Sequence, residues 1–302
     1  MKGRVPMKRS HGHICLILSL GKMAVRPVAV SEVTERSLKI PTGDRMSQQK
    51  KKSVEKGIGD TFQQETKYTP ERLRGHSLDW NSFPAIYKSY EAPLARINLP
   101  QPEIDHEPSL WRLLRKRRSR RAYKVEQKLT QGLLSALLWA TQGLTARQGD
   151  MYFRTTPSAG GLYPVETYLL VRAVDGLEPG IYHFRPLNAD LEFLKRGDYA
   201  RALARAALGQ EVVADAQATF IWSAVLARSK WKYRERAYRY IYIDAGHIGQ
   251  NLYLAAEALD LGVCTIGAFF DDDVNSLIGV DGLAETVIYM GCVGRPAQES
   301  DQ

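Results

Sequence analysis

Hydrophobic and polar residues follow a regular pattern only in the later part of this chain. Up to about residue 65 no apolar period lasts longer than one helical turn, and Gly, Ser, Gln and Lys are frequent. Such a composition buries too little apolar surface to offset the entropy of ordering, so we expect residues 1–65 to be disordered. Beyond them, β-branched and aromatic runs predict strands at Thr167–Val174, Gly180–Phe184, Leu191–Leu194, Ala218–Leu226 and Thr286–Val293.

Helices are predicted where apolar residues recur every three or four positions. Ser109 and Thr130 are placed to cap the first two of them. The others cover Asp198–Leu208 and Asp244–Leu261, and Gly262 ends the second of these. Because helices and strands are mixed without a steady alternation, the pattern favours an α+β layered fold over a doubly wound parallel sheet.

The positive charge belongs to the beginning of the chain. Residues 1–60 hold 13 Lys and Arg against 5 Asp and Glu, whereas the other 242 residues of the 302 hold 29 against 28. We therefore predict a basic tail, 1–65, followed by a nearly neutral domain, 66–298, that starts with a proline-rich lead-in segment, 66–108. This division weakens a DNA-binding interpretation of the whole protein.

Several protein classes are disfavoured by composition. The three cysteines, Cys15, Cys264 and Cys292, have no metal or redox spacing, so we expect buried free thiols in a reducing compartment and no metal site. The longest aliphatic stretch, Ile14–Leu18, is too short to span a bilayer. A cytoplasmic protein that does not bind membranes is the resulting expectation.

A basic segment is the first candidate for chemistry. Arg112–Lys124 holds eight Lys and Arg and no acidic residue. Arginine forks with a neighbouring Ser hydroxyl suit phosphate oxygens. The same segment is also explained as a solvated helix end or as part of a nucleic-acid surface, although only Tyr123 supplies an aromatic ring for the latter.

Two glycine-containing loops are the next candidates. Pro157–Glu166 has adjacent glycines that would let the backbone approach a flat ligand, but it matches neither a Walker loop nor a dinucleotide motif. Gly262–Phe270 places Gly267 and Ala268 where backbone N–H groups could face a cofactor. The acidic triplet that follows, Asp271–Asp273, is interpreted as the first turn of a helix.

The last candidate segment surrounds the start of the long predicted helix. Lys232 and Tyr233 could act as an acid/base pair, or be a surface lysine beside a core tyrosine. His247 lies close to the start of that helix, but with no second His or Cys at ligand spacing zinc is disfavoured.

In this order the segments resemble the flavin-dependent nitroreductase superfamily, most closely its branch of SagB-type dehydrogenases and azoline oxidases. The resemblance covers about residues 68–296. It rests on the ordered set Arg-Arg-Ser-x-Arg, Pro-Ser-Ala-Gly-Gly-Leu-Tyr-Pro, Asp-Ala-Gly-His-x-x-Gln-Asn-Leu and Gly-Arg-Pro. It implies a layered α/β/α fold with a mainly antiparallel central sheet. It also implies a homodimer, for which the apolar stripe of Asp244–Leu261 is the candidate core.

The resemblance also implies roles for individual residues. FMN contacts through phosphate and ribityl groups would come from Arg117, Arg118, Ser119, Arg121 and Arg295. A loop from the neighbouring subunit would supply further contacts through Pro157, Ser158, Ala159 and Gly161. A loop at the flavin edge would contribute Ile266, Gly267 and Ala268. Many nitroreductases have an acidic residue where this chain has Gly267.

In azoline oxidases of this branch a Lys-Tyr pair is the catalytic base, which corresponds to Lys232 and Tyr233. The implied function is an FMN oxidoreductase that moves two electrons in ping-pong fashion between NAD(P)H, or a bound small-molecule or modified-peptide substrate, and a second acceptor. Three alternatives stay open. They are an azoline dehydrogenase of a modified-peptide pathway, an FMN-binding member without turnover, and a basic module that binds nucleic acid or an anionic surface.

Overall fold

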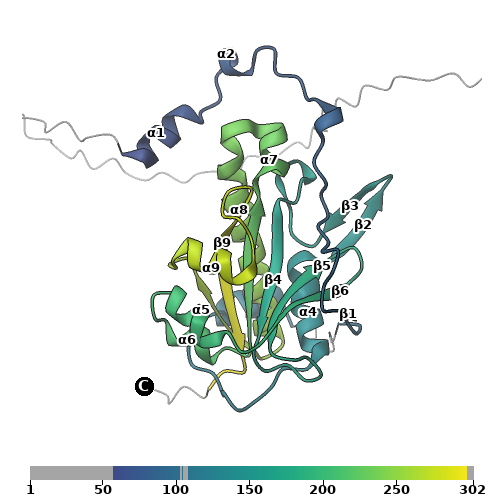
Figure 1. The fold of residues 1–302 in the computed structure, drawn as a ribbon, viewed down its shortest axis with the longest axis vertical. Helices are drawn as coiled ribbons and strands as arrows, with labels where there is room; N and C mark the ends of the chain where they lie inside the picture. Colours follow the sequence, from purple (N-terminus) through teal and green to yellow (C-terminus); the bar gives the residue numbers. More distant parts are fainter. Residues whose placement is uncertain (1–56, 103, 105–107, 298–302) are drawn as a thin grey trace, which may run out of the picture. The chain divides into compact units, whose positions relative to one another are not determined.

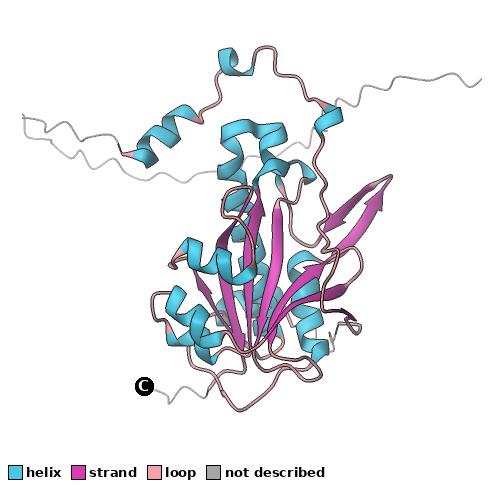
Figure 2. Cartoon of the chain, viewed as in Figure 1, coloured by secondary structure: helices cyan, strands magenta, loops and turns pink. Residues whose placement is uncertain are grey.

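A seven-stranded sheet forms the centre of the protein (Figures 1 and 2). The computed structural model describes residues 57–102, 104 and 108–297. The strands lie in the order β1-β6-β5-β4-β7-β9-β8, and every neighbouring pair is antiparallel. Their bounds are β1 Ala95–Asn98, β4 Val165–Val171, β5 Gly180–Arg185, β6 Asp190–Arg196, β7 Ala218–Val225, β8 Gly262–Ile266 and β9 Glu285–Gly294. The predicted α+β class and antiparallel sheet are confirmed.

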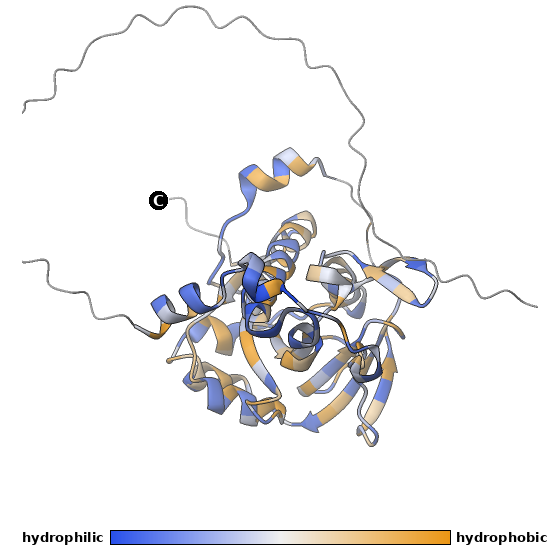
Figure 3. Cartoon of the chain, turned by 90° about the horizontal axis from the view of Figure 1, so that it is seen from above, coloured by the Kyte–Doolittle hydropathy of each residue, from blue (hydrophilic) through white to orange (hydrophobic). Residues whose placement is uncertain are grey.

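Helices cover both faces of this sheet, which gives three layers. On one face α4 (Gln131–Gln142) and α8 (Ala237–Ala258) bury Leu134, Leu138 and Leu252 against the strands. The second face carries three shorter helices, α5 (Ala200–Ala206), α6 (Glu211–Asp215) and α9 (Asp271–Ile278). The strands are correspondingly rich in hydrophobic residues (Figure 3). Nearly all residues of β4 and β7 are buried.

The five predicted strands all exist, and four further strands were missed. The second sheet is a hairpin of β2 (Leu144–Gln148) and β3 (Met151–Arg154). Both hairpin strands are mostly exposed, so their sequences lack the hydrophobic alternation that identifies a half-buried strand. The other two, β1 and β8, are edge strands of four and five residues, too short for a periodic signal.

Of the predicted helix ends, the Thr130 cap is confirmed, whereas the Ser109 side chain makes no capping hydrogen bond. The predicted end of α8 at Gly262 was wrong, because Leu259 is its C-cap residue and Gly262 begins β8, and the predicted start of α8 was wrong as well. Thr130 caps α4 by accepting a hydrogen bond from the backbone N–H of Leu133 (3.1 Å), and Ser109 is the N-cap residue of α3 (Leu110–Lys116). The three aspartates form the first turn of α9, as predicted. By contrast, α8 begins seven residues before Asp244, directly after α7 (Leu226–Tyr233) and the short helix η3 (Arg234–Arg236).

The apolar stripe of α8 packs into the core of its own chain, so this stripe is not free for a dimer contact, and the role of the helix in a dimer stays a prediction. Ile248, Leu252 and Ala256 are buried in the hydrophobic core beneath the sheet of the same chain. The exposed face of this helix instead presents Tyr242 and Ile243. A wide apolar stripe identifies a buried face but not the element that covers it.

The expected disorder up to residue 65 is wrong at its end. Residues 1–56 lie outside the described residues, but Ile58–Glu65 form helix α1. Arg239 donates to the carbonyl of Gln63 (2.7 Å), and Arg236 donates to that of Thr66 (2.9 Å), so contacts distant in sequence hold the end of this helix. The lead-in segment continues through α2 (Pro70–Leu73) and η1 (Trp80–Ser82).

Candidate functional site

The Pro157–Gly161 loop is clamped to α8 by one carboxylate. Asp244 accepts hydrogen bonds from the Ser158 hydroxyl (2.5 Å) and from the backbone N–H of Ala159 (3.1 Å). Burial raises the pKa of Asp244 above its usual value, although both hydrogen bonds act in the opposite direction. We had assigned Asp244 only as the start of a helix. Its position inside α8 lets it hold the loop.

The same loop lies against the predicted acid/base pair, Lys232 and Tyr233. Gly160 lies in η2 (Ala159–Gly161) with φ +67°, and a Cβ built there would be 2.6 Å from the Tyr233 hydroxyl and 3.1 Å from Lys232 Nζ. Only glycine permits so close an approach. Burial, then the neighbouring Tyr240 and Asp244, raise the pKa of Tyr233. The loop and the Lys-Tyr pair, predicted as separate candidates, are therefore neighbours.

The basic segment lies against β8, beside the predicted flavin-edge loop. Ser119 forms a parallel bridge with Val263, and its hydroxyl lies 3.0 Å from that of Tyr253 on α8. The Arg117 guanidinium stacks over the Tyr253 ring, 5.2 Å from its centroid. The Tyr253 hydroxyl also accepts from the backbone N–H of Thr265 (3.0 Å). These contacts join the segment to the strand that leads into Ile266.

The remaining predicted arginines are exposed or only partly buried. Arg118 donates to the carbonyls of Arg115 and Arg117, and Arg121 lies beside the buried thiol of Cys264. Arg295 donates to the carbonyl of Lys128 (3.1 Å), so its side chain contacts the loop before α4. None of Arg117, Arg118, Arg121 and Arg295 has a carboxylate partner among the described residues. Their charge is available to an anion.

The Ile266–Ala268 loop offers backbone groups beside open space. Ile266 is buried at the end of β8, whereas Gly267 and Ala268 are exposed. No heavy atom lies within 4 Å of a Cβ built on Gly267. The predicted arrangement, a small-residue loop that a flat ligand can approach, is compatible with this geometry.

The site residues form two groups that share α8. Asp244 anchors the group of Pro157–Gly161 with Lys232 and Tyr233, and Tyr253 anchors the group of Arg117–Arg121 with Ile266–Ala268. Nine residues of helix separate the two anchors, which corresponds to about 13 Å along its axis. The two groups are therefore held at different heights along one helix.

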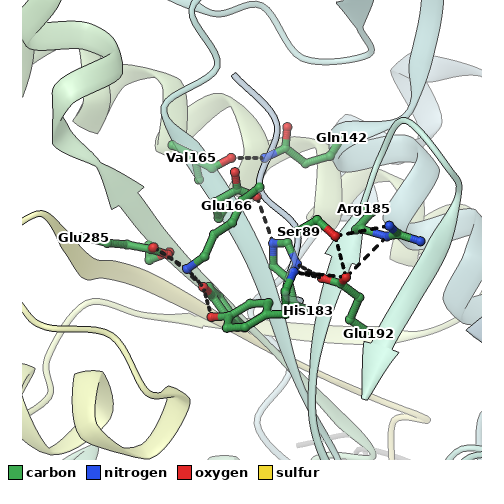
Figure 4. Close-up of polar contacts among 12 residues, drawn as sticks. Ser89, Gln142, Val165, Glu166, His183, Arg185, Glu192 and Glu285 are labelled. Carbon is green, nitrogen blue, oxygen red and sulfur yellow. Dashed lines mark hydrogen bonds and ion pairs between the residues drawn. The ribbon is translucent and has the colours of Figure 1, made fainter. Parts of the chain in front are cut away.

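A buried ionic cluster supports the first group, and the sequence interpretation missed it (Figure 4). His183 is fully buried and lies between two carboxylates, 3.1 Å from Glu166 and 3.0 Å from Glu192. Arg228 of α7 lies 2.6 Å from Glu166. Burial raises the pKa of Glu166, but the His183 hydrogen bond and the Arg228 charge outweigh it and bring it to about 2.

This cluster also fastens the lead-in segment across the sheet. Glu192 accepts from the Ser89 hydroxyl (2.7 Å) and from the backbone N–H of Tyr90. Lys88 pairs with Glu285 at 2.6 Å. The sequence does contain a signal for this cluster, namely charged residues at inward positions of apolar strands. Charged residues are rarely buried unless they are paired.

Other predictions have definite outcomes. Cys264 and Cys292 are buried free thiols as expected, and burial raises the pKa of both, that of Cys292 to about 12. Cys15 lies outside the described residues.

Tyr123 is buried, with its hydroxyl donating to the Cys292 carbonyl, and so cannot stack on a nucleic-acid base. Within the described part of the chain, no helix is long and apolar enough to cross a membrane.

Comparison with known proteins gives one family and several relatives. The profile described as "Nitroreductase family" matches residues 114–295. The nitroreductase-like protein MJ1384 of Methanocaldococcus jannaschii is 37% identical over 179 residues, which are 59% of this chain and 88% of that protein. The microcin B17-processing protein McbC of Escherichia coli is 27% identical over 134 residues, 42% of this chain and 49% of its own.

A solved structure supports the same fold. The crystal structure of a nitroreductase-like protein from Anabaena variabilis superposes with a TM-score of 0.67 at 32% identity. The match covers 79% of this chain but only 46% of that protein, and the McbC match likewise spans less than half of the relative. Residues 114–295, which the family profile matches, contain both groups of candidate site residues.

Proposed function

Because the chain belongs to the nitroreductase family, we propose that it is an FMN-dependent oxidoreductase that transfers two electrons between NAD(P)H, or a bound substrate, and a second acceptor. Members of this family bind FMN. The observation that carries the proposal is that the basic segment lies against β8, the strand that leads into the small-residue loop, through the Ser119–Val263 bridge and the Tyr253 hydroxyl.

The residues present fit a phosphorylated flat ligand. Arg117, Arg118 and Arg121 have no carboxylate partner among the described residues, and arginine forks match phosphate oxygens. The open space at Gly267 would let a ring reach the backbone of that loop. We assign the phosphate and ribityl contacts to the arginines with Ser119 and Arg295, and the ring contacts to Ile266–Ala268.

When bound, FMN supplies the two-electron chemistry, accepting hydride from one substrate and delivering it to another. The chain's own groups would orient and stabilise. Backbone N–H groups of Ile266–Ala268 are fixed dipoles that favour negative charge close to them. Lys232 and Tyr233 would hold or move a proton beside Gly160.

We propose a homodimer that joins the two groups of site residues. Pro157–Gly161 and Arg117–Arg121 are anchored at separate positions along α8 of one chain. In a two-fold arrangement the loop of one protomer can complete the arginine group of its partner, because each interface patch is used twice. Light scattering coupled to gel filtration should give twice the chain mass of 34.0 kDa.

The reaction is tested with purified protein, NADPH or NADH, and a nitroaromatic acceptor. We expect consumption of the nicotinamide only when acceptor or oxygen is present. Replacing Arg121 by Gln should lower retention of the flavin, whereas Arg196→Gln, on β6 and separated from β8 by four strands of the sheet, should not. Turnover without flavin, or flavin retention unaffected in the triple variant of Arg117, Arg118 and Arg121, would contradict the assignment.

A second candidate function is oxidation of an azoline ring in a modified peptide. The contact of Gly160 with Lys232 and Tyr233 favours it, because removal of a ring proton requires a base and nitro reduction does not. The distant relationship to McbC points the same way. In this function the substrate is a peptide and a partner enzyme forms the azoline.

The two functions are separated by substrate. A synthetic thiazoline peptide should lose about two mass units, because its conversion to the thiazole removes two hydrogens, only if the second function holds. Lys232→Met should then abolish thiazole formation and leave NADPH consumption with the nitroaromatic intact. Equal loss of both reactions would show that Lys232 serves structure or cofactor binding instead.

A further inference from the structure

A pocket of about 370 Å³ lies between the lead-in segment and the end of α7. One wall is formed by residues 65–68 with Arg72, Leu73 and His76, and the other by residues 232–236. Lys232 and Tyr233 thus line this pocket, and the lead-in segment covers them. His76 strengthens the junction, because its Nε2 lies 3.0 Å from the carbonyl oxygen of Lys232 and must donate to it.

The charge of the pocket is positive where a ligand would lie. Both of its glutamates are engaged, Glu65 with Arg72 at 3.0 Å and Glu235 with Lys230 at 3.3 Å. Neither Arg234 nor Arg236 has a carboxylate within ion-pair distance among the described residues. Arg236 already donates to Thr66 and Tyr240, whereas no side-chain partner of Arg234 is found in that part of the chain.

The backbone at Arg234 is an independent indication. Its φ of +51° and ψ of −133° lie in a region that side chains other than glycine rarely adopt. Such conformations persist where the surrounding structure holds them and gather at ligand-binding sites. Here the strained residue connects α7 to η3 and lines the pocket. A glycine would occupy this position more comfortably, so the arginine side chain requires another reason.

We propose that this pocket is a subsite for a carboxylate group of the substrate, with Arg234 as the residue that selects it. The inference rests on the proposed function, because it takes Lys232 and Tyr233 as the reacting end of the same pocket. Arg234 supplies one uncommitted guanidinium, which matches a single carboxylate better than a dianionic phosphate. The rings of Tyr68 and Tyr233 and the side chain of Leu73 give the rest of the pocket an apolar lining.

Because the arginines are permanently charged, they can bind a carboxylate without involving Lys232 and Tyr233. A guanidinium stays protonated in proteins, so Arg234 and Arg236 can hold a carboxylate without exchanging protons with it. His76 adds a polar atom, since its Nδ1 is buried and has no hydrogen-bond partner among the described residues. The substrate class that fits is an aromatic or peptide molecule with a carboxylate at one end.

The test compares two probes that differ only in charge, para-nitrobenzoate and para-nitrobenzamide, by calorimetric titration of the purified full-length protein. We expect the benzoate to bind about tenfold more tightly, as one charge-assisted hydrogen bond provides. Arg234→Gln should reduce this preference to near parity. Arg74→Gln, which removes an equal charge from an exposed part of the lead-in segment, should leave it unchanged.

Equal affinities of the two probes for the unmodified protein would overturn the proposal, as would a preference that survives in Arg234→Gln. Tighter binding of NADPH than of NADH, without any preference for the benzoate, would also overturn the proposal, because the positive charge of the pocket would then serve a phosphate group. Flavin content, measured on the same samples, separates the two levels. Flavin without the preference refutes the subsite alone, and the preference without flavin refutes the proposed function alone.

Discussion

The buried ion pair between Glu166 and Arg228 provides a sharp test of what holds the site. Both side chains are at most 4% exposed and lie 2.6 Å apart, and His183 reaches the second carboxylate oxygen at 3.1 Å. Glu166→Gln keeps the shape but leaves the buried Arg228 without its carboxylate partner, while His183 retains Glu192. Removal of one member of a buried pair costs about 3–5 kcal/mol, because the desolvated charge that stays is uncompensated.

The assay is urea unfolding of the purified protein near neutral pH, with Glu178→Gln as the matched control. Glu178 pairs with Arg196, but both side chains are more than half exposed, so the control should lose at most about 1 kcal/mol. A loss below about 1 kcal/mol in Glu166→Gln would refute our view that this charge is essential to the packing of β4 against α7.

The same pair makes stability depend on pH in a definite direction. The pKa of Glu166 falls from 4.5 to about 2 on folding. Because the pKa is lower in the folded state, ionised Glu166 contributes its full stabilisation above the pKa of the unfolded state. This stabilisation is lost as the pH falls through the pKa of the folded state. Unfolding free energy should therefore decline between about pH 4.5 and pH 2 more steeply in the unmodified protein than in Glu166→Gln. Parallel curves would contradict the assignment.

Three further outcomes are expected. Arg234→Gly should raise the free energy of unfolding by about 1 kcal/mol, because glycine relieves the strained φ. The same variant should bind the carboxylate probe more weakly. A loss of stability in thermal unfolding would contradict the strain argument. Gly160→Ala should slow thiazoline oxidation about tenfold or more by displacing the Tyr233 hydroxyl. Its control, Gly209→Ala, has a similar φ but no neighbour within 4 Å and should only lower the melting temperature. Asp244→Asn should increase proteolysis within Pro157–Gly161, and unchanged cleavage would refute the clamp.

Much of the fold could be predicted because its central strands and capped helices carry local signals. Thr130 caps α4 through its own side chain, and β7 is a continuous apolar run. The hairpin β2–β3 and the early start of α8 could not be predicted in the same way. Exposed strands have no hydrophobic alternation. The first turns of α8 bury Ala237 and Ile241 against Ala224 of β7, a contact between segments that no local pattern reveals.

The candidate site was predictable by segment but not by geometry. The motifs located Arg117–Arg121, Pro157–Gly161 and Ile266–Ala268, yet nothing local indicates which of them are neighbours. Tyr253 joins two of the segments, and Asp244 holds the third, because both project from one helix at different heights. The pairing of Gly160 with the Lys-Tyr pair likewise depends on how α7 ends, which the backbone of Arg234 determines.

The central claim is that this chain holds FMN through the arginine segment and the loop after β8. Its most direct test is the visible absorption spectrum of the purified protein, with the released chromophore identified by mass. We predict the two bands of an oxidised flavin and the mass of FMN, at about one per chain. A colourless protein that also fails to take up added FMN would contradict the account and leave both segments with structural roles only.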